Sequence, residues 1–164
     1  MRALASLAVV TLATAALAQG TPRQAMLKTN GGAAAGTVSL VPAPKGMLLK
    51  VDAKGLTPGW HAIHVHEKGD CSDAAFKAAG GHTHEGTPPV HGLLNANAND
   101  TGDLPNIHVA ANGTAQAELF TTLLTADAVG DADGSAIVIH AKPDDHQSQP
   151  IGGAGDRVAC GVVK

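Results

Sequence analysis

The sequence predicts an all-β domain, an antiparallel sandwich or barrel, and three observations lead to this prediction. Short segments of alternating apolar and polar residues recur along the chain, separated by Gly, Pro and Asn. Asn112-Gly113, between two such segments, is a strong signal for a tight hairpin. No long stretch has the period of an amphipathic helix. Many short strands at this spacing are typical of an antiparallel sandwich or barrel.

Each expected strand is bounded by residues that favour turns. The first ends at Asn30-Gly31-Gly32, the second ends at Pro42, and the third is followed by Gly55-Leu56-Thr57-Pro58-Gly59. The strands on either side of Asn112-Gly113 form the expected hairpin. The segments with strand character are residues 24–29, 36–41, 47–53, 60–66, 107–111, 114–121, 136–140 and 158–163.

Two long segments, residues 69–106 and 141–157, have no strand pattern. Within the first, residues 73–79 are compatible with one short helical turn. Loops of this length in a compact domain are usually functional or disordered. Most of the remaining histidines and acidic residues lie in these two loops, so we expect them to be functional.

The N-terminus has the features of a secretory signal. A basic start at Met1-Arg2 is followed by an apolar run rich in Ala and Leu, and Ala16-Leu17-Ala18 offers small residues for cleavage. The alternative is a membrane anchor, but the run is shorter than the ~20 apolar residues that a stable span needs. We therefore expect residues 1–18 to be a signal peptide, residues 19–164 to be one domain, and no membrane association after cleavage.

Composition narrows the remaining classes. The net charge is -3 and no basic stripe is present, which argues against a nucleic-acid partner. Nine histidines are the unusual count. Cys71 and Cys160 are the two cysteines, and an even count in an exported protein favours a disulfide. Two buried free thiols are the alternative.

His64-Val65-His66 lies on an expected strand, where residues two apart point to the same face. Two imidazoles on one face can chelate an ion, although paired surface histidines are a common alternative. Further candidate ligands lie at the end of another strand and in the long loop: His140, His82, His91, Asp100 and Asp103. Copper and zinc both bind imidazole, and zinc also accepts carboxylates. The sequence therefore indicates copper or zinc, and it has no His-Glu-x-x-His pattern for a zinc protease.

Four collinear stretches resemble the signatures of the copper/zinc superoxide dismutases. Their residue sequences are similar to those of the exported bacterial branch. They are residues 59–71 (GWHAIHVHEKGDC), residues 80–106 with Gly80-Gly81-His82, His91 and Gly102-Asp103-Leu104-Pro105-Asn106, residues 140–145 (HAKPDD), and residues 155–161 (GDRVACG). The resemblance implies an eight-stranded Greek-key β-sandwich, or flattened barrel, with two long functional loops.

The resemblance also implies residue roles. Four histidines would bind copper, namely His64, His66, His82 and His140, and His82 would bridge to zinc. The remaining zinc ligands would be His91, Asp103 and the residue at position 100. Arg157 would attract superoxide beside the copper, and Asp144 would hydrogen-bond both His64 and His91. His61 would support the copper ligands, and a Cys71–Cys160 disulfide would anchor the loop near Arg157.

This chain departs from the family at position 100, where the family has histidine and the chain has Asp100. Either Asp100 binds zinc in a site of two histidines and two carboxylates, or the enzyme works with copper alone. We favour the first interpretation because His91, Asp103 and Asp144 are present and zinc tolerates mixed N and O ligands. His84 is a further candidate for the missing ligand.

The resemblance implies superoxide dismutase activity in the periplasm, which converts two superoxide anions to oxygen and hydrogen peroxide and protects the cell envelope. This reaction needs an ion that cycles between two oxidation states, and zinc cannot do so. A copper-delivery module on the same scaffold is the alternative, and loss of a copper ligand or of Arg157 would favour it. Monomer and homodimer both remain open.

Overall fold

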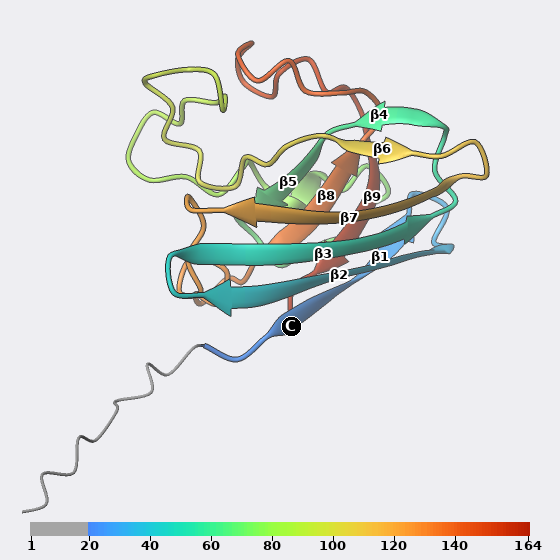
Figure 1. The fold of residues 1–164 in the computed structure, drawn as a ribbon, viewed down its shortest axis with the longest axis horizontal. Helices are drawn as coiled ribbons and strands as arrows, with labels where there is room; N and C mark the ends of the chain where they lie inside the picture. The colour runs from blue at the N-terminus through green and yellow to red at the C-terminus, as the bar shows by residue number, and fades with distance from the viewer. Residues whose placement is uncertain (1–19) are drawn as a thin grey trace, which may run out of the picture.

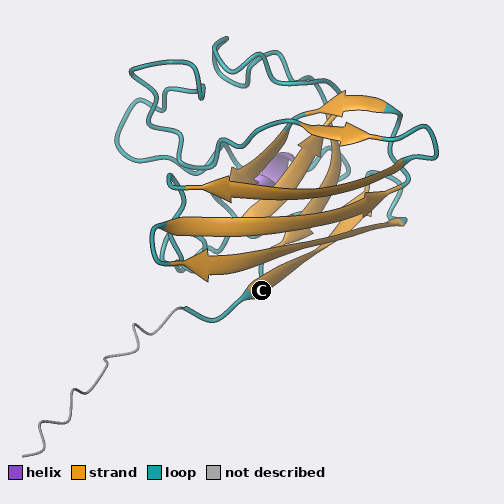
Figure 2. Ribbon diagram, viewed as in Figure 1, coloured by secondary structure: helices purple, strands orange, loops and turns teal. Residues whose placement is uncertain are grey.

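The computed structural model describes residues 20–164, so the expected signal peptide at residues 1–18 lies outside the described part of the chain (Figure 1). Strands dominate the fold (Figure 2). The strands are β1 (Arg23–Thr29), β2 (Ala34–Ala43), β3 (Gly46–Lys54), β4 (Gly59–His61), β5 (Ile63–His66), β6 (Ile107–Val109), β7 (Thr114–Thr121), β8 (Ala136–His140) and β9 (Arg157–Val162). A 3-10 turn, η1 (Lys77–Ala79), lies in the first long loop. None of the described helices is long and apolar enough to cross a membrane.

The sheet order confirms the antiparallel prediction. Seven strands form one sheet in the order β5-β8-β9-β1-β2-β3-β7, and β4 pairs with β6 in a second sheet. The β6–β7 hairpin connects the second sheet to the β7 edge, where Ala110 donates its N–H to the Thr114 carbonyl. Because β4 runs on into β5 at the opposite edge, the chain closes the two sheets into a flattened barrel.

The expected single strand at residues 60–66 is interrupted at Ala62. The Ala62 N–H donates to the Lys142 carbonyl, and the Ala62 carbonyl accepts from the His140 N–H. These bonds remove Ala62 from the ladder and let β4 pair with β6 while β5 pairs with β8. Counted as one interrupted strand, β4 and β5 reduce the nine strands to the eight that the resemblance implies.

The core fills the interior of the barrel and is aliphatic. Along β3, Met47, Leu49, Val51 and Ala53 are buried, whereas the residues between them face outward. This period-2 pattern is what the alternation in the sequence predicts. Phe76 packs in a separate small cluster with the Cys71–Cys160 disulfide, which joins the first long loop to β9.

The two long loops lie on the same side of the barrel (Figures 1 and 2). The Leu94 N–H donates to the His146 carbonyl, and Gln149 bonds both the N–H and the carbonyl of His91. Gly92 makes this approach feasible, since a Cβ atom there would lie 2.4 Å from the His146 carbonyl oxygen. The loops thus lie beside β5 and β8, the strands that carry His64, His66 and His140.

Candidate metal centre

Four buried imidazoles from three parts of the chain meet at one point. His64 and His66 project from β5, and His140 ends the neighbouring strand β8. His82 comes from the first long loop, which an isolated bridge to His66 holds against β5. One ring nitrogen of each histidine lies within 4.8 Å of those of the other three. The sequence-predicted copper ligands are therefore brought together.

Each of these imidazoles has one ring nitrogen engaged and one free. His64 Nε2 lies 2.9 Å from Asp144 Oδ2, and His66 Nδ1 lies 3.0 Å from the Gly80 carbonyl oxygen. His140 Nδ1 and His82 Nδ1 are held in the same way, by the Gly155 carbonyl and by Asp103. The opposite nitrogens are buried and have no hydrogen-bond partner among the described residues: His64 Nδ1, His66 Nε2, His82 Nε2 and His140 Nε2.

The electrostatics of three of these imidazoles favour the neutral, metal-binding form. Burial lowers the pKa of His64 to about 4 and that of His140 to about 3, and it lowers the pKa of His66 well below its usual value. Neighbouring imidazoles lower all three further. Four unpartnered imidazole nitrogens fit a copper ion, for which imidazole is a suitable ligand. Burying them unpaired would otherwise be unfavourable.

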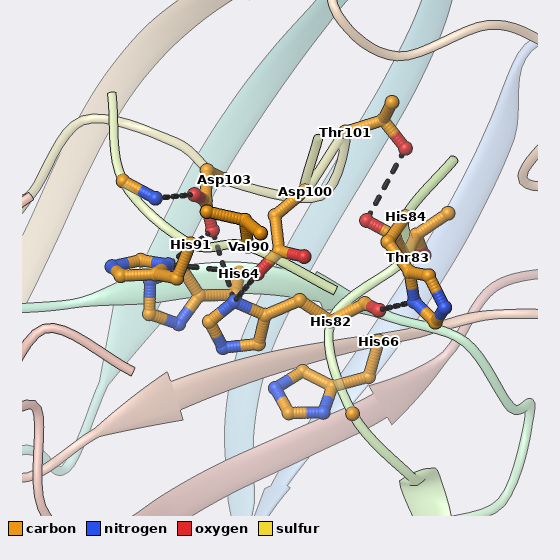
Figure 3. A network of polar contacts seen from close by, with 12 residues as sticks. His64, His66, His82, Thr83, His84, Val90, His91, Asp100, Thr101 and Asp103 are labelled. Carbon is orange, nitrogen blue, oxygen red and sulfur yellow. Dashed lines mark hydrogen bonds and ion pairs between the residues drawn. The ribbon is translucent and has the colours of Figure 1, made fainter. Parts of the chain in front are cut away.

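A second group of donors lies beside Nδ1 of His82 (Figure 3). His82 Nδ1 and His91 Nδ1 each lie 2.9 Å from Asp103 Oδ1. Asp100 Oδ2 lies 3.2 Å from His82 Nδ1 and 3.7 Å from His91 Nδ1. His64 is also close to this group, but its free Nδ1 belongs to the first one and its Nε2 contacts Asp144. Two nitrogens and two carboxylates fit a zinc ion.

The pKa values of the histidines in the second group shift in the opposite direction from those of His64, His66 and His140. Burial opposes ionisation of both histidines, but hydrogen bonds that His82 donates to Asp100 and Asp103 outweigh it and raise the pKa of His82. The same balance, with Asp144 added, raises the pKa of His91 to about 11. Hydrogen bonds accepted from His82 and His91 overcome burial and lower the pKa of Asp100 and Asp103. The carboxylates are thus ionised and present their charge to a cation.

Asp144 links the two groups, as the resemblance implied. Its Oδ2 meets His64 Nε2, and its Oδ1 lies 3.1 Å from His91 Nε2. Asn106, which sequence reasoning did not single out as a site residue, holds this aspartate. The Asn106 side chain donates to the Asp144 carbonyl (2.9 Å) and accepts from the Asp144 N–H (2.8 Å). Asn106 is the last residue of the motif Gly102-Asp103-Leu104-Pro105-Asn106, and this position in the sequence could have indicated that it belongs to the site.

Arg157 borders the first group. Its guanidinium donates to the carbonyl oxygens of Phe76 (2.6 Å) and Gly80 (2.7 Å). The Gly80 carbonyl also contacts His66, so one peptide orients both the arginine and an imidazole of the first group. Burial lowers the pKa of Arg157 somewhat, but an arginine remains charged at neutral pH. A cavity of about 340 Å³ is lined by Arg157, His82, His91 and Asp100 among others.

The remaining residues that the sequence analysis named lie around these two groups. His61 is buried, and its ring nitrogens face the His140 carbonyl (2.6 Å) and the Thr57 carbonyl (2.8 Å), so it braces the end of β8. His84 Nδ1 contacts the His82 carbonyl instead of joining the second group, which leaves Asp100 in that position. Cys71 and Cys160 form the expected disulfide.

The family described as "Copper/zinc superoxide dismutase (SODC)" matches residues 34–163 of the chain. A protein named "Superoxide dismutase [Cu-Zn]" from Caulobacter vibrioides is 58% identical over 146 residues, which cover 85% of this chain and 84% of that protein. "Superoxide dismutase [Cu-Zn] 2" from Aquifex aeolicus is 36% identical over 159 residues, 93% of this chain and 92% of the other.

Solved structures agree with the sequence relatives. The Cu/Zn superoxide dismutase from Brucella abortus superposes with a TM-score of 0.74 at 29% identity, covering 88% of this chain and 100% of that one. A SOD-like protein from Bacillus subtilis superposes with a TM-score of 0.76 at 32% identity, covering 85% and 96%. The fold, the two donor groups and these relatives support superoxide dismutase activity with copper and zinc. The chain belongs to the copper/zinc superoxide dismutase family.

Proposed function

We propose that His64, His66, His82 and His140 bind the copper ion at which this chain dismutates superoxide. The observation that carries the proposal is the set of four buried, unpartnered imidazole nitrogens within 4.8 Å of one another. When bound, copper supplies the one-electron redox change that the reaction needs. Two superoxide anions and two protons give one oxygen and one hydrogen peroxide.

The second group supports zinc binding through His82, His91, Asp103 and Asp100. The position of Asp100 Oδ2 beside both Nδ1 atoms favours this interpretation over an enzyme that works with copper alone. A dication in this place would replace the protons that the raised pKa values of His82 and His91 indicate in its absence. Asp144 would then fix His64 and His91 together.

The chain's own residues account for substrate handling. Arg157 carries a fixed charge and several donors at the edge of the cavity of about 340 Å³, which we call the catalytic cavity, so it can attract and orient a small anion. His82 Nδ1 is held by Asp103, which leaves Nε2 to hold a proton whenever that nitrogen is free of metal. A charged arginine at this place also favours an enzyme over a copper carrier, which has no need to attract an anion.

The proposed cellular setting is the periplasm, where the enzyme would protect the cell envelope. The apolar N-terminal run and the disulfide support export, because disulfides persist in oxidising compartments. The net charge of -3 supports the expectation that nucleic acid is not a partner. A homodimer is a proposal that sedimentation of the mature protein would test, and N-terminal sequencing of periplasmic protein would test cleavage after Ala18.

The activity is tested by removing both metals and restoring them one at a time. Copper should restore dismutation, and zinc alone should not. Arg157→Ala, with copper retained, should lower the rate and flatten its decline with ionic strength, because one fixed charge leaves the approach path. Activity restored by zinc alone would contradict the copper assignment, and an unchanged salt profile would remove Arg157 from the substrate path.

A further inference from the structure

Two cavities border the second donor group, and Asp100 lines both. The first is the catalytic cavity of about 340 Å³, which Arg157 and His82 also line. The second has a volume of about 500 Å³, and Asp103 and Glu85 also line it. We call the second one the acidic cavity. The group therefore has a second face, away from the arginine.

The two cavities differ in charge. Arg157 lines the catalytic cavity together with the acidic residues Glu67 and Asp100, and its fixed positive charge attracts an anion and repels a divalent cation. The described residues that line the acidic cavity include Glu85, Asp100 and Asp103 and no Lys, Arg or His. The catalytic cavity therefore favours an anion more than the acidic cavity does, and the acidic cavity favours a cation.

Asp100, which lines the acidic cavity, has a carboxylate oxygen that no other described residue uses. Asp100 is only 5% exposed, and its Oδ1 has no hydrogen-bond partner among the described residues. The amide oxygens of Asn95 and Asn99 at the same cavity already accept backbone N–H groups. An unpartnered buried carboxylate oxygen is costly unless a cation or a donor reaches it.

Glu85 is placed at the outer end of this path. Its side chain is exposed, and its N–H donates to the Asn99 carbonyl (2.9 Å), next to Asp100 in the chain. The backbone pairing of His84 with Asp100 fixes the same two segments against each other. The cavity thus has an exposed carboxylate outside and two buried carboxylates inside.

We propose that the acidic cavity is the entrance through which a divalent cation reaches the second donor group, separate from the path of superoxide past Arg157. Glu85 is the outer residue that captures the cation, and Asp100 is the inner one that receives it. The inference rests on the proposed zinc site. Zinc and superoxide would then approach through different cavities. Zinc could bind without passing the positive charge of Arg157, which attracts the substrate.

The test is the rate of zinc uptake by copper-loaded, zinc-free protein, followed in a stopped-flow instrument with a coloured zinc indicator. At low salt, Glu85→Gln should slow zinc association by about threefold and Glu85→Lys by about tenfold, with zinc dissociation unchanged. Glu118→Gln, which removes the same charge from the outer face of β7, is the matched control and should keep the wild-type rate.

Glu67→Lys distinguishes the two entrances, because Glu67 lines the catalytic cavity and not the acidic one. Zinc association should be slowed less by Glu67→Lys than by Glu85→Lys. The reverse order, or wild-type rates in both Glu85 variants, would overturn the entrance while leaving zinc binding itself intact. Failure of the wild-type protein to bind zinc at all would overturn the proposed zinc site and this inference with it.

Discussion

The two donor groups share His82 yet differ in how the fold prepares them. In the first group, burial and mutual repulsion keep three imidazoles neutral, and their free nitrogens converge with that of His82. In the second, carboxylates dominate and raise the pKa of His82 and His91. Neutral imidazoles predominate in the first group, whereas the second contains two ionised carboxylates. The difference supports the proposed assignment, with copper at the imidazole group and zinc at the group that contains carboxylates.

The largest expected effect is on the neutral group. His140→Ala removes one of its four nitrogens and should lower copper-dependent dismutation by about a hundredfold or more, because misplacing the reacting centre is that costly. The barrel should stay folded, since His140 ends its strand. Copper content and activity must be measured together, because three nitrogens can retain the ion. A folded, copper-loaded variant with full activity would exclude His140 as a ligand.

The two groups should also respond in opposite ways to pH in the metal-free protein. In the unfolded chain, imidazoles gain protons as the pH falls below about 6.5, but the buried His64 and His140 do so only near pH 4 and pH 3. The unfolded state then binds more protons than the folded state. The free energy of unfolding should therefore decrease as the pH is lowered from 6.5 to 4. His91 acts oppositely: its contribution is complete below pH 6.5 and is lost as the pH rises towards 11.

Denaturant titrations of metal-free protein at several pH values would measure this effect. His140→Gln should make the decrease between pH 6.5 and 4 shallower, since one of the buried imidazoles is gone. A free energy of unfolding that is flat across this range, or a His140→Gln slope as steep as that of the wild type, would show that the neutral group is not as described.

The smallest expected effect concerns the link between the groups. Asn106→Ala removes two hydrogen bonds to the Asp144 peptide and should cost about 1–3 kcal/mol of stability. Zinc should also dissociate faster, because Asp144 no longer holds His91 in place. Asn112→Ala, in the exposed turn before β7, is the matched control and should leave zinc release unchanged. In an Asp144→Ala background, Asn106→Ala should have no further effect on zinc release, whereas a persisting effect would show a general structural role.

Sequence patterns predicted the strands well because alternation and turn residues are local signals. The hairpin strand at residues 114–121 and the strand at 136–140 have the predicted bounds. The interruption at Ala62 was not predictable, since it depends on bonds to Lys142 and His140 from distant parts of the chain. The resemblance supplied the donor residues, but the role of Asn106 and the two faces of Asp100 required the loops to be placed against each other.

The most direct test of the account is the metal content of wild-type protein, His140→Ala and Asp100→Ala after loading with copper and zinc. Wild-type protein should hold one of each, and His140→Ala should bind copper weakly while it keeps zinc. Asp100→Ala should lose zinc while it keeps copper, with a lower melting temperature because zinc no longer stabilises the fold. Asp100→His should restore zinc. If each substitution released both metals equally, or if Asp100→Ala bound zinc as wild type does, the two groups would not be distinct sites.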